Sequence, residues 1–337
     1  MFTTVAGGRV FEYDYCIGMQ GVGAAAGRGF PVPVDFSLVN GLLYVMCRGA
    51  AEVAGQRVSI TSIDHELINV FGSHGSGDGQ FSWPTSIDLD KEGNIYTADE
   101  WLTRITAFDN SGKFLHKWGE IGDGDGQLNR PSGIAFDKED NLYVVDSLNN
   151  RIQVFTKHGK LLHKWGSLGN EDGQFDMPWG IRIDQSGNVF VADWRNSRVQ
   201  KFTPDGKFLM KFEEDDAGVG EIFRPTSVAV DSEGDVYITD WGKNRLQVYA
   251  PDGDFVTSLY GDAEEPSAWA KEYIGVNPDY VQVRRRVVGL KDIEKVFNRP
   301  VSVNIDDQDR IFVLETGRHR VQVYNKDKNF LEAQLNL

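Results

Sequence analysis

The residues best suited to chemistry lie just after strand-like segments that end in an acid. Glu100 follows Asp99 directly, Arg195 lies two residues after Asp193, and His319 lies near Glu315. Carboxylate, guanidinium and imidazole groups on a common rim can exchange protons with a substrate and bind its anionic part. We therefore select Glu100, Arg195 and His319 as candidate catalytic residues, with Glu315 placed to orient the imidazole.

Two further charged residues interrupt a position that otherwise prefers a small side chain. Equivalent positions hold Ala135 and Ala229, but also Asp88 and Arg182. Charged groups among crowded strands must be paired, hydrated or used. Asp88 and Arg182 are therefore also candidate catalytic residues, and the alternative is that they sit in an inert network of channel water.

Several aromatic and polar residues occupy the same stretches. Tryptophans that converge at one opening would form an aromatic-walled pocket, and the alternative is simple packing between loops. The substrate-binding candidates are Trp101, Trp179, Trp194, Trp241, Arg48, Thr85, Thr226, Tyr273 and Tyr280.

Motifs for a cofactor are absent from the sequence. We find no nucleophile elbow, phosphate-binding loop, zinc-ligand spacing or dinucleotide fingerprint. Asp123 and Asp125 suggest a calcium loop, but no bidentate glutamate follows at the required spacing, which favours a plain turn. No cofactor is evident, and a divalent metal with unknown ligands stays open.

Composition limits the class of protein. The 337 residues are 25% charged with a net charge of −15, a composition typical of folded chains and repulsive to nucleic acid. Two cysteines, Cys16 and Cys47, cannot form a disulfide framework. No basic and apolar leader and no long apolar run is present, so we expect a cytoplasmic protein without membrane contact.

The elements that position these residues come from an internal repeat. Pro84, Pro131, Pro178 and Pro225 are each 47 residues apart, and an acid and an arginine follow each proline at fixed spacing. Each copy contains four short β-rich runs, for example 132–136, 141–145, 151–155 and 161–165. Four strands in about 45 residues, repeated, predict the blades of a β-propeller.

Two weaker copies bring the number of blades to six. One begins at Pro300 and the other at Pro33, so the prediction is an all-β, six-bladed propeller over residues 1–337. One terminal strand must complete the last blade and close the ring. Residues 11–18 and residues 330–335 are the two candidates.

An insertion over residues 262–299 separates the fifth and sixth copies. Ser267 and Pro278 are plausible helix starts, so the segment is expected to be partly helical. It falls on the face that carries the candidate residues, where it would form a lid, or else serve as a solvated decoration or an oligomer contact.

The pattern that begins at proline and continues through Asp-x-x-Asn-x-Arg, as in residues 131–155, resembles NHL-repeat six-bladed β-propellers. This resemblance implies the fold but little about function, because such propellers include RNA-binding modules, protein scaffolds and an amidating lyase.

Two activities that the resemblance implies, the amidating lyase and RNA binding, fit the residues of this sequence poorly. The lyase would place zinc-binding histidines directly after the blade-opening prolines, and RNA binding would need basic loops. The loops are acidic instead. The six positions after the prolines contain no histidine: Val34, Thr85, Ser132, Trp179, Thr226 and Val301.

The sequence therefore predicts one of two functions. The first is a lyase or hydrolase, cofactor-free or metal-assisted, that acts on a small molecule in an axial pocket on the top face. The second is a non-catalytic module that binds a peptide or protein on that face. A homo-oligomer or a protein partner is compatible with either, and an enclosing lid would favour the enzyme.

Overall fold

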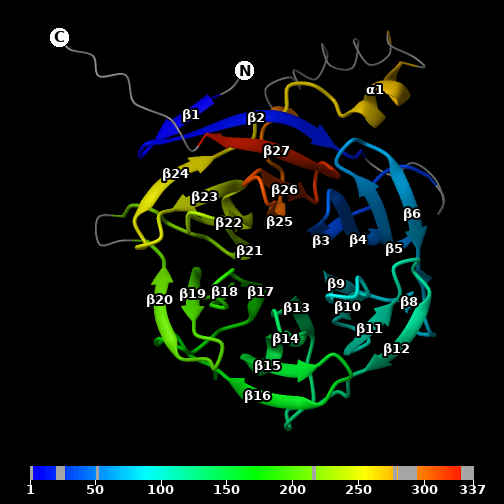
Figure 1. Ribbon diagram of the computed structural model, residues 1–337, viewed down its shortest axis with the longest axis vertical. Coiled ribbons are helices and arrows are strands. Elements are labelled where there is room, and N and C mark those ends of the chain that lie inside the picture. The colour runs from blue at the N-terminus through cyan, green and yellow to red at the C-terminus, as the bar shows by residue number, and fades with distance from the viewer. Residues whose placement is uncertain are drawn as a thin grey trace.

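The protein is described from a computed structural model that covers residues 3–19, 27–50, 53–214, 218–275, 279 and 294–327. Six antiparallel sheets surround a central axis, as Figure 1 shows. The all-β, six-bladed propeller is thereby confirmed. Within the described ranges no helix is both long and apolar enough to cross a membrane.

The first three blades follow chain order from the inside of the ring outwards. The first contains β3 (Pro33–Val39), β4 (Leu42–Ala50), β5 (Val53–Ser62) and β6 (Leu67–Phe71). The second contains β9 (Pro84–Leu89), β10 (Ile95–Asp99), β11 (Arg104–Phe108) and β12 (Phe114–Trp118). The third contains β13 (Pro131–Phe136), β14 (Asn141–Asp146), β15 (Arg151–Thr156) and β16 (Leu161–Trp165).

The remaining blades repeat this order. The fourth contains β17 (Pro178–Ile183), β18 (Val189–Asp193), β19 (Arg198–Phe202) and β20 (Phe208–Phe212). The fifth contains β21 (Pro225–Val230), β22 (Val236–Asp240), β23 (Arg245–Tyr249) and β24 (Phe255–Leu259). The sixth contains β25 (Pro300–Ile305), β26 (Ile311–Glu315), β27 (Arg320–Asp327), β2 (Arg9–Ile17) and β1 (Thr3–Ala6). Short extras are β7 (Ser73–His74), β8 (Gln80–Phe81), the 3₁₀ turns η1 (Ser147–Asn149) and η2 (Trp241–Lys243), and the helix α1 (Ala268–Ile274).

Blade packing follows from the apolar residues on both faces of each sheet. Ile87, Ile134 and Val228 recur at one position of the first strand and are buried between neighbouring blades. A single four-stranded sheet could not bury two apolar faces, whereas a ring of sheets buries both. The two cysteines are also buried in this core, and both are free thiols.

The amino-terminal strand closes the ring. β2 pairs antiparallel with β27, with Phe11 opposite Lys326 and Ile17 opposite Val321. This confirms the alternative that placed residues 11–18 in the last blade; residues 330–335 lie outside the described residues. Joining the two ends of the chain in one sheet ties ring closure to the folding of both.

A repeated ion pair holds the upper turn of four blades. The Arg151 Nε atom donates to the Asp146 carboxylate at 2.7 Å, and the Arg198 Nε atom donates to Asp193 at 3.0 Å. Equivalent pairs join Arg245 to Asp240 and Arg320 to Glu315. The structural role expected for the recurring acid and arginine is therefore observed in four blades.

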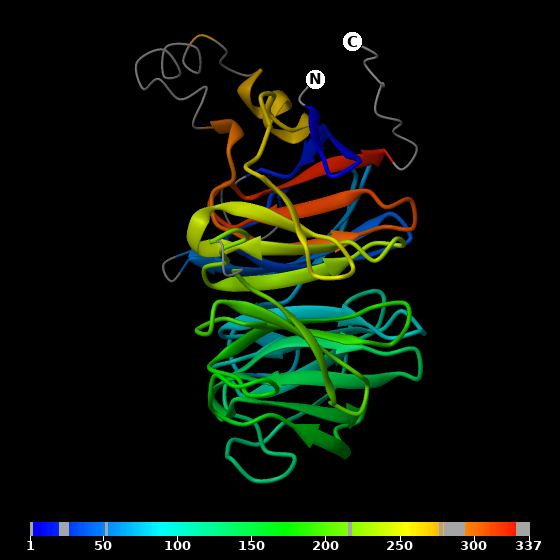
Figure 2. The same ribbon diagram turned by 90° about the vertical axis from the view of Figure 1, so that its left-hand side faces the viewer.

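The helix α1 of the insertion packs on the outer wall of the ring, whereas Arg299 at the end of the insertion directly precedes β25. Trp269 of α1 is buried against Phe30 and Ile17, and its indole Nε1 donates to the His65 carbonyl at 2.6 Å. Figures 1 and 2 show α1 beyond β2, outside the ring rather than above its opening. A lid over the opening stays a prediction, because residues 276–278 and 280–293 lie outside the described residues.

A buried lysine links the closing blade to its neighbour. The Lys326 ammonium, which is fully buried, donates to Asp231, Glu233 and Asp235 at 2.6, 2.6 and 2.8 Å. Asp235 also pairs with Arg9 of β2. Burial acts to raise the pKa of Asp235, but the bonds from Arg9 and Lys326 outweigh it and lower that pKa.

We expect Lys326→Met to destabilise the fold by about 3–5 kcal/mol at pH 7, because it leaves buried carboxylates without their cation. The effect should shrink towards pH 4, as those carboxylates take up protons. Lys157 is a matched control: it occupies the same repeat position but is partly exposed beside Asp90 and Glu92. Lys157→Met should cost only about 1 kcal/mol. Urea unfolding at both pH values measures this, and equal losses in the two variants would contradict the assignment.

Candidate functional site

The innermost strands enclose a narrow axial channel. It is lined by the first four or five residues of β3, β9, β13, β17, β21 and β25, and its free volume is about 30 Å³. A water molecule needs roughly 10–15 Å³ measured in this way. The channel therefore has room for one or two waters but not for a small-molecule substrate.

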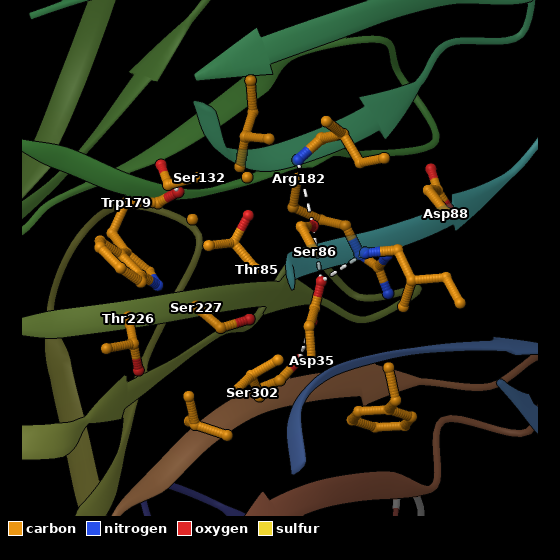
Figure 3. A pocket seen from close by; sticks show the side chains of 18 of the residues that line it. Asp35, Thr85, Ser86, Asp88, Ser132, Trp179, Arg182, Thr226, Ser227 and Ser302 are labelled. Carbon is orange, nitrogen blue, oxygen red and sulfur yellow. Dashed lines mark hydrogen bonds between the residues drawn. The ribbon is translucent and has the colours of Figure 1, made fainter. Parts of the chain in front are cut away.

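Asp35 lies at the centre of this channel and was not selected from the sequence. Its carboxylate accepts hydrogen bonds from the Ser86 and Ser302 hydroxyls at 2.6 and 2.7 Å and from the Ile87 amide at 3.1 Å. Figure 3 shows the bond to Ser86. Burial raises the pKa of Asp35, although these three bonds act to lower it.

The repeat itself contained the signal for Asp35. The second residue after the blade-opening proline is Ser86, Gly133, Gly180, Ser227 or Ser302 in the other copies. A carboxylate in this ring of small residues is as strong a departure as Asp88. It was missed because the first blade is the most divergent copy.

Asp88 and Arg182 lie towards the opposite end of the channel from the tryptophans. They are three residues further along the first strand than Thr85 and Trp179, which corresponds to about 10 Å of extended chain. In Figure 3, Trp179 and Thr226 lie at one end and Asp88 at the other. One small substrate cannot contact both groups through a channel of 30 Å³.

The two candidate threonines join neighbouring blades. The Thr85 hydroxyl donates to the Pro131 carbonyl at 3.0 Å, and the Thr226 hydroxyl lies 3.0 Å from the Thr239 hydroxyl and 3.5 Å from the Pro300 carbonyl. Ser132 makes the equivalent bond to the Pro178 carbonyl at 3.3 Å. Thr85 and Thr226 are buried, so their hydroxyls primarily satisfy inter-blade carbonyls.

Around the upper opening the structure brings arginines and aromatic rings together. We define the mouth ring as two sets of residues. The first set contains the residue before and the residue after each blade-opening proline. The second set contains the two residues that follow each upper-turn acid, or that follow Cys47 in the first blade, where it replaces the acid. The Arg48 guanidinium stacks over the Trp83 ring at 4.6 Å, and that of Arg224 over Trp194 at 4.7 Å. Trp101 is 70% exposed and Trp83 is 44% exposed. The mouth ring is therefore an open surface with aromatic and cationic groups.

The charge of the mouth ring is opposite to that of the whole chain. Its single acid is Glu100, and its five arginines are Arg48, Arg130, Arg195, Arg224 and Arg299. Sequence reasoning missed Arg130, Arg224 and Arg299, which directly precede a blade-opening proline. All three have positive φ angles of 53–59°, which turn the chain into the first strand.

Glu100 and Arg48 of the mouth ring both have shifted pKa values. Burial raises the pKa of Glu100, while the charges of Arg48 and Arg130 act to lower it. Burial also lowers the pKa of Arg48, whose Nε atom donates to the Pro84 carbonyl at 3.2 Å. Arg195 is largely exposed, and its Nη1 atom lies 3.5 Å from the Asp176 Oδ1 atom. Trp241 is half-buried in η2 beside this surface.

The structure gives His319 partners other than Glu315. Its Nδ1 atom lies 2.9 Å from the Phe30 carbonyl and 3.2 Å from the Val32 amide. The Glu315 carboxylate accepts instead from Asn298, Arg320 and Gln322. His319 has a φ of 57° at its turn, which directs the ring to the connection before β3. Burial lowers its pKa, which favours the neutral imidazole.

The two candidate tyrosines are not brought to the mouth ring. Tyr273 lies on α1 at the outer wall and is 58% exposed. Tyr280 lies outside the described residues. The catalytic and binding roles of all these residues stay predictions.

The acidic group best placed for a metal already holds a cation. Among the described residues, Asp231, Glu233 and Asp235 form the one group of three potential ligands within mutual reach. The Lys326 ammonium bonds to all three, and Arg9 bonds to Asp235. A divalent ion would have to displace a buried lysine, so this group fits a metal poorly.

Sequence families agree with this architecture. The profile of the NHL repeat matches residues 224–249 and 297–324, and that of the SMP-30/Gluconolactonase/LRE-like region matches residues 88–214. The chain is a six-bladed β-propeller whose fifth and sixth blades match the NHL repeat, in line with the resemblance of its sequence pattern. No curated protein matches the sequence.

Solved structures share the fold at low identity. A protein of unknown function from Bacteroides thetaiotaomicron has a TM-score of 0.61 at 19% identity, over 95% of this chain and 76% of that one. A streptogramin B lyase has a TM-score of 0.58 at 11% identity, over 95% and 98%. An auxiliary nutrient binding protein from Bacteroides ovatus has a TM-score of 0.60 at 12% identity, over 94% and 77%.

The burial of Asp35 leads to a prediction about pH. Because its pKa is raised in the folded state, its contribution to stability is greatest at low pH and is lost as the pH rises through the folded pKa. The amide of Asp35→Asn cannot titrate and should cost about 1–3 kcal/mol at low pH through lost hydrogen bonds. The free energy of unfolding of the wild type relative to this variant should fall between pH 4 and pH 7. A difference that rises with pH would contradict the proposed burial effect.

Proposed function

We propose that this protein is a binding module whose mouth ring holds an acidic peptide segment of a partner protein. The observation that carries this proposal is that one face of a chain with a net charge of −15 gathers five arginines and two exposed tryptophans around a single acid. Arginine and tryptophan are the residues that most often dominate protein interfaces. Stacked guanidinium groups keep their edges free for carboxylates.

The open shape of the site supports a module over an axial enzyme. The channel admits one or two waters, and α1 of the insertion lies on the outer wall. Two arginines are held in place before a ligand arrives: Arg48 and Arg224, which stack on Trp83 and Trp194. A surface that is preorganised in this way loses little side-chain freedom on binding.

A peptide fits this face better than a nucleic acid. The acidic connections that surround the mouth ring include Glu120, Asp123, Asp125, Glu171 and Asp172. A phosphate backbone longer than the ring would cross this acidic rim and be repelled. A peptide can confine its own acids to the few residues that cover the mouth ring.

Charge reversal at the mouth ring tests the module. The double variant Arg130→Glu and Arg224→Glu should weaken binding of a labelled ten-residue glutamate peptide with one central tyrosine by at least tenfold. Lys211→Glu is the control for each single reversal, because Lys211 lies on the outermost strand β20 and undergoes the same change from cation to carboxylate as each of the two arginines. Fluorescence anisotropy at 50 and 300 mM salt measures the affinities, and the wild-type affinity should fall with salt.

Two results would overturn the module. The first is an equal loss in the Lys211→Glu control. The second is tighter binding of a ten-nucleotide single-stranded RNA than of the peptide.

A second candidate is a lyase or hydrolase that uses the same face. It is favoured by Glu100, whose raised pKa suits a general acid or base, and by the gluconolactonase-like profile, which spans Glu100 and Arg195. A virginiamycin B lyase from Staphylococcus aureus with quinupristin also shares the fold, with a TM-score of 0.56 at 13% identity over 94% of this chain and 88% of that one.

Turnover of the ligands named for these relatives separates the candidates. If the face is catalytic, the wild type should cleave gluconolactone or quinupristin, and Glu100→Gln should lose at least 100-fold in kcat while Arg195→Met mainly raises KM. Chromatography of the reaction mixture detects the products. Unchanged turnover in Glu100→Gln excludes this residue as the acid or base.

A further inference from the structure

The opposite opening of the propeller contains a cavity that is separate from the mouth ring. Its volume is about 610 Å³, and it is lined by the lower turns of the first three blades and by the end of β17 in the fourth. Asp88 and Arg182 are the two residues that line both this cavity and the axial channel. They form its floor, where the channel is too narrow for anything but water.

Arg182 uses fewer of its guanidinium donors than the arginines that hold the upper turns. The Arg151 guanidinium makes four hydrogen bonds, one to Asp146 and three to backbone carbonyls. Arg198 makes the equivalent four. Among the described residues, Arg182 has one acceptor, the Asn304 Oδ1 atom. Because a guanidinium has five N–H donors, the remaining donors are available for a planar carboxylate.

Asp88 offers the opposite charge on the same floor. Its carboxylate accepts from the Ser37 hydroxyl at 3.1 Å and from the Phe136 amide at 2.8 Å. Each carboxylate oxygen can accept a second bond, so both bonds leave capacity for a donor from the cavity. Burial raises the pKa of Asp88, and the charge of Arg182 acts to lower it.

The charges on the cavity wall exclude a simple anion as the occupant. The lining includes five carboxylates and three cationic groups. Asp90 is already committed, because it accepts from the Asn94 side chain and pairs with Lys157. An anion alone would meet this net negative wall, and a cation alone would meet Arg182. A molecule with both charges satisfies both ends.

We propose that this lower cavity binds a small zwitterion, with its carboxylate on Arg182 and its ammonium group on Asp88 and the acidic wall. The chemical class is an amino acid or a short ω-amino acid. The site is independent of the mouth ring, which lies at the other end of a channel with about 30 Å³ of free volume.

Calorimetric titration of the full chain with glycine, β-alanine and 4-aminobutanoate tests the site. Acetate and ethylammonium serve as the two halves of the ligand at the same ionic strength. We expect at least one zwitterion to bind at least tenfold more tightly than either half. Failure of all three zwitterions to bind, or equal binding of acetate, overturns the proposal.

Variants locate the binding. Arg182→Met should weaken binding of the best zwitterion at least tenfold, and Arg182→Lys should give an intermediate loss because it keeps the charge but not the planar fork. Arg195→Met is the matched control at the other face and should leave this affinity unchanged. If Arg182→Met fails to unfold cooperatively, the Arg182→Lys result decides. Wild-type affinity in Arg182→Lys, or a loss in Arg195→Met, overturns the assignment.

Discussion

The buried acid–arginine pair of the upper turns is the constraint on which the rest of the propeller depends. In the third blade, Arg151 pairs with Asp146 and also donates to the carbonyls of Asp123, Gly124 and Gln127 in the preceding connection. These carbonyls lie in a partly buried loop, where backbone acceptors need partners. One side chain therefore fixes both the turn within a blade and the link between blades.

This constraint determines what the upper face can present. In the fourth blade, Trp194 directly follows the paired Asp193, so it is fixed at the rim without being needed for the sheet. The cation–π contact of Arg224 with Trp194 is then made between two blades that are already rigid. A rigid scaffold that fixes variable rim residues suits recognition of a partner, because little ordering remains for the moment of binding.

On the lower side of the ring, ion pairs between side chains join neighbouring blades. Lys326 and Arg9 neutralise the acidic turn of the fifth blade, and Lys157 does the same less completely for the second blade. These contacts join blades through charge where the upper side uses backbone carbonyls. The cavity beside Asp88 lies among such turns, which explains why its wall is acidic and its floor carries the less used guanidinium of Arg182.

The sequence by itself determined the number of blades, their strands and the pairing of acids with arginines, because the 47-residue step records one structural unit several times. It also identified Asp88 and Arg182 as departures from that unit. It could not show that these two residues lie at the other end of the channel from Trp179, since that follows from strand direction around a closed ring. Nor could it place α1, because Trp269 finds its pocket between two blades far apart in the chain. The gathering of Arg130, Arg224 and Arg299 was likewise decided only in three dimensions, where the ring brings residues from separate repeats to one opening.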